Sequence, residues 1–535
     1  DESLKSHLAQ ALSDQAGMQR VDADAGLDIL FAYTEREHAF TDKEKDVLIR
    51  AIDDCKILDP ACGSGAFPMG VLHKLVFILG KLDSGNQRWR QRQLDAVEAI
   101  PDSTAREAAI TAIEDAFDKN EDDYGRKLYL IENCLYGVDI QPIAIQISKL
   151  RFFISLICDQ KTNRDKAKNH GIRPLPNLET KFVAADTLIG MPEMEQSLLI
   201  DPRVEEIERE IESLYHRHFG IQRRDQKIAL QRRIKELRKQ LGEILSESLM
   251  APTKAQHVAD WDPFDPQSSA DFFDPHWMFG KQLSEGFDVV IGNPPYISVE
   301  KFAGTPIQAK WKETFETYAA RGDVYCFFYE RGAQLLKDGG SLVYITSNKW
   351  MRTGYGSKLR KFLSTGVDTE SVLDFGMAQN FSAATTYTCI TRFYKQAPDD
   401  RILSCYATDD RAAIADPAAY FTENHIVQPN LSEDAWVVLS KERQRIKSLV
   451  EAQGTPLGKW DLQISRGVIT GFNEAFYLEQ DVRDALINED PASEELIGKL
   501  LRGRDIGRYG VNWPETYQLI IKFGEYKDLE ERYPA

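Results

Sequence analysis

Short apolar runs alternate with helix-like patterns along most of the chain, from Lys56 to about Phe393. A few consecutive apolar or β-branched residues mark a strand, whereas apolar residues three or four positions apart mark a helix. Their alternation is typical of an α/β domain built on a mostly parallel sheet. The runs predict strands at Ile57-Leu58, Leu135 to Val138, Phe182 to Ala184, Phe287 to Ile291, Ser341 to Thr346, Ser371 to Leu373 and Thr386 to Arg392.

Polar residues follow the first four of these strands. They are Asp59, Asp139, Asp186 and Asn293. Ligands of open α/β sheets bind outside the carboxyl ends of the strands. These four side chains are therefore the first candidates for a functional site.

The same patterns divide the chain into parts. Residues 1–54 predict mixed helix without a motif, and residues 55–397 form the α/β domain. Beyond 397 the alternation is lost, so we expect a connector over 398–454. A second domain of mixed α/β type is expected over 455–535, cut short at Ala535.

Two polar, helix-like insertions interrupt the α/β domain, at about 83–126 and about 201–250. The second has apolar residues at alternating steps of four and three positions: Leu230, Ile234, Leu237, Leu241 and Ile244. This spacing predicts a helical hairpin that packs on itself. The pattern does not indicate what the hairpin does.

Composition excludes several classes of protein. No stretch of about 20 apolar residues lacks a charge, so we expect no membrane span. The chain has seven cysteines, no C-x-x-C pair and no signal peptide at its start, which argues against a disulfide framework and a zinc site. We expect a cytoplasmic protein without a bound metal, in which every cysteine is a packing residue.

The formal net charge of -18 is unusual for a protein that binds nucleic acid, but three clusters reverse the sign locally. Arg223 to Lys239 holds eight basic residues against two acids, and Lys349 to Lys361 holds five against none. The third cluster consists of Lys499, Arg502, Arg504 and Arg508. Each cluster is either a solvated surface or part of a DNA-binding groove, and the sequence leaves both interpretations open.

A glycine-rich turn, DPACGSGAF, joins the first strand to the next helix at Asp59 to Phe67. Gly63 and Gly65 allow the backbone to turn sharply and approach a ligand closely. Such a turn binds NAD, FAD or S-adenosylmethionine, or closes a tight loop. It lacks the Gly-Lys-Ser/Thr of a phosphate-binding P-loop.

A nucleoside cofactor needs an acid that accepts from its ribose hydroxyls, usually about 20 residues after the glycines. Asp83 has that spacing but follows a helix. Asp139 follows a strand and precedes Pro142, which can begin the next helix, so we prefer it. Asp186 is placed to accept from the adenine amino group of the cofactor, or else caps a helix.

The most specific signal is NPPY, Asn293 to Tyr296, directly after the fourth strand. The paired Pro294 and Pro295 fix the backbone so that the Asn293 side chain and the Pro294 carbonyl can point at one spot. Two acceptors keep the lone pair of an exocyclic amine on nitrogen, ready to attack a methyl group. Tyr296 offers a flat face on which a base can stack.

With these motifs in place, the chain resembles the adenine-N6 DNA methyltransferases of restriction-modification systems. The resemblance implies a Rossmann-like, S-adenosylmethionine-dependent fold, with cofactor-binding residues Asp59, Ala61, Gly63, Gly65, Phe67, Asp139, Ile140 and Asp186. It implies catalytic roles for Asn293, Pro294, Pro295, Tyr296 and Phe381, although Tyr387 competes with Phe381 as the second stacking aromatic. The family's aromatic-Thr-Pro element is only faintly echoed by Ala32-Tyr33-Thr34.

The resemblance extends to the second domain. Arg466 to Leu478 and Leu500 to Tyr509 look like the start of the target-recognition domain of large single-chain enzymes that join cleavage and methylation. It therefore implies double-stranded DNA as partner and a nuclease domain or subunit outside this chain. Glu179-Thr180-Lys181 and Glu525-Tyr526-Lys527 match a nuclease tripeptide, but we expect neither to cleave.

Other functions remain open at this point. Another planar amine, such as protein glutamine, RNA guanine N2 or cytosine N4, is an alternative target. A DNA-binding defence protein with a vestigial site is another. Cytosine-C5 methylation is disfavoured because the sequence has no Pro-Cys pair to supply the nucleophile.

Overall fold

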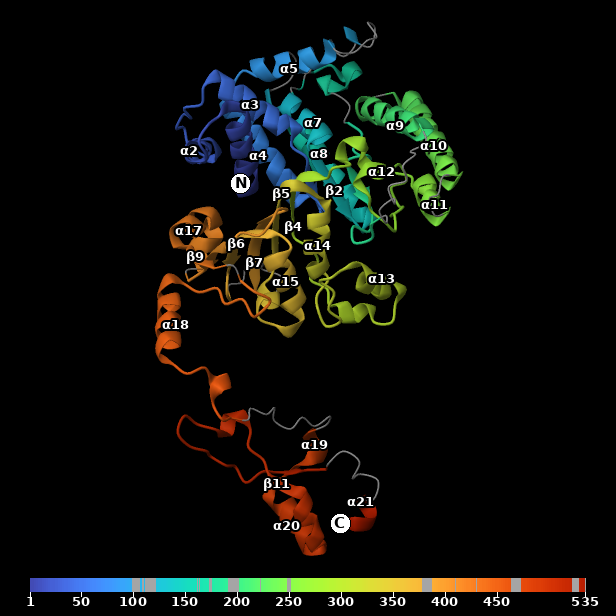
Figure 1. Cartoon of the computed structure of the whole chain (residues 1–535). Helices are drawn as coiled ribbons and strands as arrows, with labels where there is room; N and C mark the ends of the chain where they lie inside the picture. Colours follow the sequence, from blue (N-terminus) through green and yellow to red (C-terminus); the bar gives the residue numbers. More distant parts are fainter. Residues whose placement is uncertain are drawn as a thin grey trace. The chain divides into compact units, whose positions relative to one another are not determined.

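The computed structural model (Figure 1) describes residues 1–98, 106–107, 110, 122–160, 162, 164–172, 176–190, 202–221, 223–247, 252–377, 387–408, 410–429, 431–462, 473–521 and 529–534. The chain divides into two compact units, Asp1–Ser448 and Leu449–Ala535.

The first unit is built on a sheet in the order β3-β2-β1-β4-β5-β7-β6-β8-β9. All the predicted strands are present in it, so the predicted α/β class is confirmed. The strands are β1 Ile57–Asp59, β2 Leu135–Asp139, β3 Phe182–Ala184, β4 Phe287–Gly292, β5 Leu336–Ser347, β6 Asp368–Asp374, β7 Thr388–Tyr394, β8 Arg401–Tyr406 and β9 Ile426–Pro429.

Strands β3, β2, β1, β4 and β5 are parallel neighbours, and β6 and β8 run in the same direction. Strands β7 and β9 run the opposite way. From β1 the chain builds the sheet outward through β2 and β3, then returns to add β4 on the other side of β1. Such a reversal leaves a crevice at the carboxyl ends of β1 and β4, where ligands of these sheets bind.

Successive residues of the central strands β1 and β4 pack into two different hydrophobic cores, one on each face of the sheet. Ile57 of β1 and Val289 of β4 pack with the helices on one face, whereas Leu58 and Val290 pack with those on the other. The first face carries α1 Glu2–Ala11, α2 Arg20–Phe31, α3 Asp42–Asp54, α4 Ala66–Leu82, α7 Asp122–Asn133 and α8 Pro142–Cys158. The second carries α12 Pro275–Phe279, α13 Pro306–Thr314, α14 Tyr325–Leu335 and α15 Ser357–Thr365.

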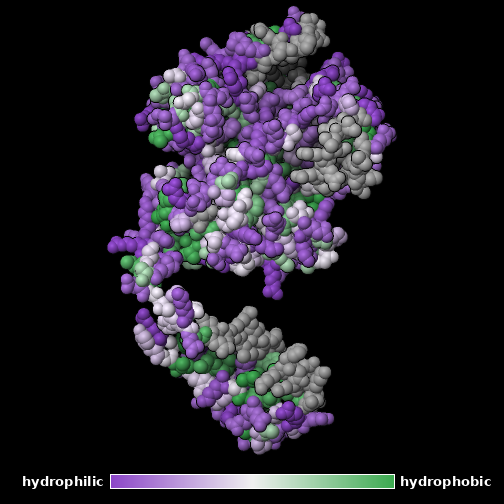
Figure 2. Space-filling view, in the orientation of Figure 1, coloured by the Kyte–Doolittle hydropathy of each residue, from purple (hydrophilic) through white to green (hydrophobic). Residues whose placement is uncertain are grey.

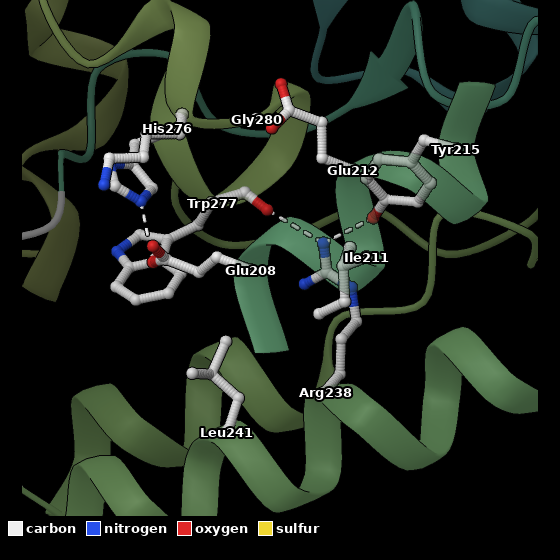
Figure 3. A pocket seen from close by; sticks show the side chains of 10 residues that line it. Glu208, Ile211, Glu212, Tyr215, Arg238, Leu241, His276, Trp277 and Gly280 are labelled. Carbon is white, nitrogen blue, oxygen red and sulfur yellow. Dashed lines mark hydrogen bonds and ion pairs between the residues drawn. The ribbon is translucent and has the colours of Figure 1, made fainter. Parts of the chain in front are cut away.

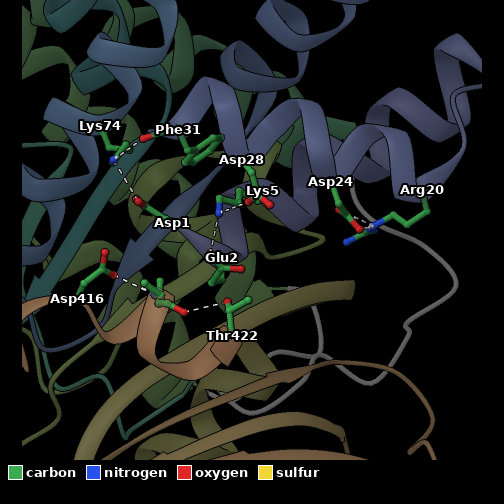
Figure 4. Close-up of polar contacts among 12 residues, drawn as sticks. Asp1, Glu2, Lys5, Arg20, Asp24, Asp28, Phe31, Lys74, Asp416 and Thr422 are labelled. Atoms are coloured by element: carbon green, nitrogen blue, oxygen red, sulfur yellow. Dashed lines mark hydrogen bonds and ion pairs between the residues drawn. The ribbon is translucent and has the colours of Figure 1, made fainter. Parts of the chain in front are cut away.

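The predicted N-terminal helices are anchored to this first face (Figure 4). Lys74 of α4 binds the Asp1 carboxylate at 3.1 Å and the Phe31 carbonyl oxygen at 3.2 Å. Lys5 of α1 bridges to Asp28 of α2 at 2.6 Å. These contacts join α1, α2 and α4, so residues 1–54 pack as part of the first unit.

The second insertion is the predicted hairpin. Helices α9 Pro202–Gly220 and α10 Arg224–Glu247 pack together with α11 Pro252–Asp260, and all five residues of the predicted seam are buried. Buried Arg238 joins the hairpin to the rest of the unit, because it donates to the Tyr215 hydroxyl at 2.6 Å and to the Trp277 carbonyl at 2.8 Å (Figure 3). In the first insertion, α5 Gln87–Glu98 is helical as predicted.

The sheet continues beyond residue 397, where the sequence pattern predicts the end of the α/β domain. Strands β8 and β9 lie within the predicted connector, together with α16 Asp410–Ala415, α17 Pro417–Asn424 and α18 Lys441–Gln453. The buried residues Ile402 and Trp436 belong to the same core as Leu342. The predicted boundary at 397 is therefore wrong. The apolar side chains after it still pack on the sheet, although the βα alternation has stopped.

The second unit contains a small antiparallel sheet in the order β10-β12-β11. Its elements are β10 Tyr477–Leu478, β11 Ile497–Lys499, β12 Tyr517–Leu519, α19 Asn473–Phe476, α20 Gln480–Glu489 and α21 Leu529–Arg532. This mixture of short helices and strands agrees with the predicted α/β character. In Figure 2 the visible face of the first unit is mostly hydrophilic, whereas that of the second unit mixes hydrophilic and hydrophobic residues.

Within the part of the chain that the structure describes, no helix is long and apolar enough to cross a membrane. The same residues contain no group of three or more His, Cys, Asp or Glu side chains that could hold a metal ion. All seven cysteines are free, and six are buried. Cys158 is exposed, so the interpretation of every cysteine as a packing residue is wrong there.

Candidate active site

The four polar residues predicted from strand ends meet at one edge of the sheet. Because β1, β2, β3 and β4 are parallel, Asp59, Asp139, Asp186 and Asn293 all follow carboxyl ends on the same side. Asp59 ends β1 and Asn293 follows β4, and these two strands are parallel neighbours. A side chain at Gly292 would place its Cβ 2.7 Å from Asp59 Oδ1, so glycine is needed where the two strand ends come together.

The glycine turn is held against the end of β2. Gly63 and Gly65 have φ angles of +53° and +76°, in the left-handed region that favours glycine. The Ser148 hydroxyl of α8 donates to the Gly63 carbonyl at 2.9 Å, and a Cβ at Gly65 would meet this hydroxyl oxygen at 2.9 Å. No heavy atom lies within 4 Å of a Cβ built on Gly63. The backbone at Gly63 therefore faces open space.

Asp139 connects the glycine turn to the next helix. One carboxylate oxygen accepts from the Gly63 backbone N–H at 2.9 Å, and the other accepts from the Gln141 N–H at 2.8 Å. Each oxygen keeps a lone pair for a further donor. The rival Asp83 lies at the far end of the 17-residue α4, roughly 25 Å along that helix. Of these two acids, Asp139 is the one whose carboxylate binds the glycine turn.

Asp59 is a buried carboxyl with one unsatisfied oxygen. Its Oδ1 accepts from the Ala61 N–H at 3.1 Å, whereas its buried Oδ2 has no hydrogen-bond partner among the described residues. Burial raises the pKa of Asp59 to about 8, and the nearby negative charge of Asp139 acts in the same direction. A cationic group at this position would satisfy the free oxygen and favour the charged carboxylate.

Asp186 follows β3 and is buried. Its carboxylate accepts from the Leu188 N–H at 3.0 Å, and burial raises its pKa. Two contacts fix the neighbouring Thr187. Its hydroxyl donates to the Pro60 carbonyl at 2.7 Å, and its own carbonyl accepts from the Arg331 Nε–H at 2.9 Å. Sequence motifs do not reveal Arg331, because a lone arginine in a helix carries no signal.

The NPPY segment follows β4 directly. The Asn293 Oδ1 atom is buried and, in the described part of the chain, has no hydrogen-bond donor. The half-buried Tyr296 donates its hydroxyl to the Ile345 carbonyl at 3.3 Å, and its ring lies edge-on to that of Tyr325 with centroids 5.8 Å apart. A buried, unsatisfied acceptor costs free energy, so this atom is poised to receive a donor from a ligand.

The remaining predicted site residues occupy different surroundings. Ala61 is partly buried against the core of the second face, and Ile140 is exposed. Phe67 lines a cavity of about 730 Å³ that also contacts Lys74 and Val343, and none of the four polar edge residues lines it. The cofactor-binding role of Phe67 stays a prediction.

The two candidates for the second stacking aromatic cannot be ranked by their contacts. Phe381 lies outside the described residues. Tyr387, just before β7, accepts the Asn348 backbone N–H with its carbonyl at 3.0 Å. The choice between them stays a prediction.

A further acid occupies this edge of the sheet. Asp374 ends β6, is fully buried, and accepts from the Asn348 side-chain amide at 2.7 Å and from the Gly376 N–H at 2.9 Å. Arg352 lies 3.5 Å from its other oxygen. The sequence does contain the signal, because Asp374 follows a predicted strand as the first four polar residues do. Asp374 is not among the predicted site residues, because those residues follow only the first four strands.

The basic clusters differ in how far the protein itself neutralises them. In the first, Arg223, Lys227, Arg233 and Lys235 form ion pairs and Arg238 is buried. The second begins at the carboxyl end of β5, beside the NPPY edge, where Arg352 faces Asp374 and Arg360 is buried. The third belongs to the second unit. The interpretation as a solvated surface therefore fits most of the first cluster.

Comparison with known proteins supports the same type of site. A family model described as Eco57I restriction-modification methylase matches residues 133–381. The type II restriction enzyme and methyltransferase RM.Eco57I of Escherichia coli is 30% identical over 203 residues, covering 37% of this chain and 20% of that protein. The type II methyltransferase M.PaeR7I of Pseudomonas aeruginosa is 26% identical over 210 residues, covering 36% of each.

These alignments span well under half the length of either relative. Among solved structures, the type IIL restriction-modification enzyme MmeI in complex with DNA covers 91% of this chain and 48% of that chain, with 12% identity and a TM-score of 0.38. A likeness this distant carries no weight for function. The family match contains Asp139, Asp186 and the NPPY tetrapeptide. The predicted resemblance to methyltransferases of the restriction-modification type is thereby confirmed.

Proposed function

We propose that this chain is an S-adenosylmethionine-dependent DNA methyltransferase that methylates the N6 amino group of adenine. The observation that carries the proposal is the buried Asn293 Oδ1 atom, which lacks a donor among the described residues and precedes a Pro-Pro turn at the carboxyl end of β4, beside β1. An exocyclic amine is the donor that such an acceptor would take. Residues suited to a nucleoside cofactor lie at the same edge.

The residues present fit S-adenosylmethionine. Asp139 keeps spare acceptor capacity beside the glycine turn, as ribose hydroxyls require, and the free oxygen of Asp59 suits a cationic group. Asp186 supplies a further carboxylate for an amino donor. When bound, the cofactor would supply a methyl group activated by a sulfonium. The chain's own residues would bind and orient it.

The target base must leave the duplex, because its amine cannot otherwise reach a protein pocket, at a cost of a few kcal/mol. Stacking on Tyr296 and on Phe381 or Tyr387 would offset part of that cost. Asn293 Oδ1 and the Pro294 carbonyl would accept the two amino hydrogens. Held by these two acceptors, the amine would keep its lone pair on nitrogen and facing the methyl group that the cofactor would supply, and its surplus proton would pass to water.

Identifying the amine that receives the methyl group distinguishes adenine N6 from the alternative targets. The experiment incubates the chain with radiolabelled S-adenosylmethionine and a mixture of unmethylated DNA, RNA and protein, then digests each fraction and separates its components. We expect labelled N6-methyladenine from DNA and none with Asn293→Ala. Label in N4-methylcytosine, in RNA guanine or in glutamine would replace adenine as the target. Absence of cofactor binding would indicate a vestigial site.

A further inference from the structure

A basic segment follows the carboxyl end of β5. We call residues 348–361 the exit segment, and they form two short 3₁₀ helices, Asn348–Met351 and Gly354–Gly356, and the beginning of α15. The exit segment holds five basic residues and no acid, in a chain whose formal net charge is -18. Four of the five are exposed: Lys349, Arg352, Lys358 and Lys361. The exit segment is therefore a locally positive surface on an acidic protein, and such a surface attracts a polyanion.

The cations of the exit segment are mostly free to bind an anion outside this chain. Among the described residues, the side chains of Lys349, Lys358 and Lys361 form no ion pair. The guanidinium of Arg352 lies 3.5 Å from the buried Asp374 Oδ2, yet 58% of the Arg352 side chain is exposed. A guanidinium has five N–H donors, and one carboxylate uses only some of them. Asp374 thus holds Arg352 at the sheet edge and leaves donors for a second anion.

Hydroxyl contacts join the exit segment to the NPPY tetrapeptide. Tyr355 donates its hydroxyl to Asp323 Oδ2 at 3.0 Å, and its hydroxyl oxygen lies 3.0 Å from that of Tyr325. Because the Tyr355 proton goes to Asp323, Tyr325 is the donor between the two hydroxyls. The ring of Tyr325 is the one that lies edge-on to Tyr296. Tyr355 therefore fixes the exit segment relative to the ring on which the target base would stack.

Backbone contacts hold the surroundings of the exit segment in place. Next to Asp323, the Val324 N–H donates to the Ile297 carbonyl at 2.8 Å, so the chain just after the tetrapeptide is bound to the same region. At the start of the exit segment, the Asn348 N–H donates to the carbonyl of Tyr387, a residue that is 37% exposed. Exposed cations and an exposed ring at one edge are the groups with which proteins hold a nucleic-acid strand.

We propose that the exit segment binds the DNA phosphates that flank the target adenine, through Lys349, Arg352 and Lys358, and that Tyr355 positions it relative to Tyr296. The inference rests on the proposed function, because it needs a target base beside Tyr296. A flipped base stays attached to its backbone, so the neighbouring phosphates lie at the mouth of its pocket. Phosphate contacts fix the register of a protein on the duplex. Cations at a fixed position from Tyr296 would therefore set where the base enters.

The first experiment measures binding to a fluorescent DNA duplex of mixed sequence at several salt concentrations. Phosphate binding is independent of sequence, so the recognition site need not be known. Lys349→Gln and Lys358→Gln should each weaken binding and reduce the slope of log affinity against log salt by about 0.9. Lys239→Gln removes an exposed lysine of α10 in the first basic cluster and should leave the slope unchanged. Thermal unfolding checks that each variant folds.

The second experiment measures single-turnover methyl transfer over a range of concentrations of unmethylated DNA. Lys349→Gln should raise the DNA concentration needed for half the maximal rate and keep the maximal rate. Tyr355→Phe keeps the ring but removes the hydroxyl, so it should lower the maximal rate by up to roughly tenfold and keep the DNA affinity. Tyr394→Phe removes a hydroxyl contact with Ser6 at the opposite edge of the sheet and should change neither quantity.

The outcomes separate this inference from the proposed function. Unchanged salt slopes for Lys349→Gln and Lys358→Gln, in a wild type that methylates DNA, would overturn the phosphate contacts and leave the proposed function standing. An equal loss of slope with Lys239→Gln would also overturn them. If wild type binds DNA without methylating it, the proposed function fails, and the salt slopes still test the phosphate contacts. Equal rate losses for Tyr355→Phe and Tyr394→Phe would overturn the positioning role.

Discussion

The carboxyl-terminal edge of the large sheet and the second unit differ in the charge and the exposure of their polar groups. At the edge, Asp59, Asp139 and Asp374 are held by backbone N–H groups, and Asp59 and Asp374 are almost fully buried. In the second unit cations lie beside aromatic rings, as Arg508 does beside Tyr509, whose side chain is 92% exposed. Fixed acceptors suit chemistry on a few atoms, whereas an open surface of cations and rings suits contact with a long polyanion.

The largest effect is expected from removing the buried acceptor at this edge. Asn293→Ala should lower the methyl-transfer rate by roughly 100- to 1,000-fold, as loss of one preorganised polar group does in other active sites. Cofactor affinity should change little, since Asn293 would act on the target amine. Single-turnover transfer and equilibrium binding of the cofactor measure the two effects. Asn293→Asp keeps an acceptor oxygen and should retain more activity.

Removing the second unit should show whether cofactor binding and DNA binding depend on different units of the chain. A chain ending at Ser448 should bind S-adenosylmethionine normally but lose roughly 100-fold or more in DNA affinity at low salt, together with its site preference, because it would lack the cations that we propose bind phosphates. DNA titrations at several salt concentrations provide the measurement. Retained site preference would place recognition within the first unit.

The choice of Ser448 as the new end of the chain comes from the structure. Ending at Ala397, as the sequence pattern suggests, would remove Ile402, Cys405 and Trp436 from the core. That shorter chain should unfold at a lower temperature than the chain ending at Ser448. Similar thermal stability of the two would show that β8 and β9 contribute little to the fold.

A smaller effect is expected at the ribose-binding candidate. Asp139→Ala should weaken cofactor affinity by about 1.5 to 3 kcal/mol, the range for a hydrogen bond to a charged group, or roughly 10- to 150-fold. The same change at Asp83 serves as the control and should have no effect. The reverse result would return the ribose-binding role to Asp83.

Local pattern was sufficient to predict the strands, the hairpin and the four polar residues at the sheet edge. Those features depend on residue spacing, which the sequence displays directly. It was insufficient for Arg331, because the position of this side chain depends on packing between distant segments. The missed strands β8 and β9 show the same limit, since short strands at the edge of a sheet are defined by their partners. Helix α8 is recognisable in the sequence only as an apolar helix, and the structure shows which of its sides is buried.

The smallest expected effect is a change of cofactor affinity with pH. It tests whether Asp59, the buried acid at the sheet edge, faces the cationic group of the cofactor. Burial raises the pKa of Asp59 to about 8, so this carboxyl is mostly protonated at pH 7 in the free protein. A cationic cofactor favours the ionised form, so binding must release a proton below pH 8. Affinity should therefore rise with pH, by at most tenfold per unit, and level off above about pH 8.

Calorimetry from pH 6 to 9, in buffers of different ionisation enthalpy, measures affinity and proton release together. Asp59→Asn should bind more weakly and lose the pH dependence. Wild-type affinity that is flat across this range would place the cationic group of the cofactor away from Asp59.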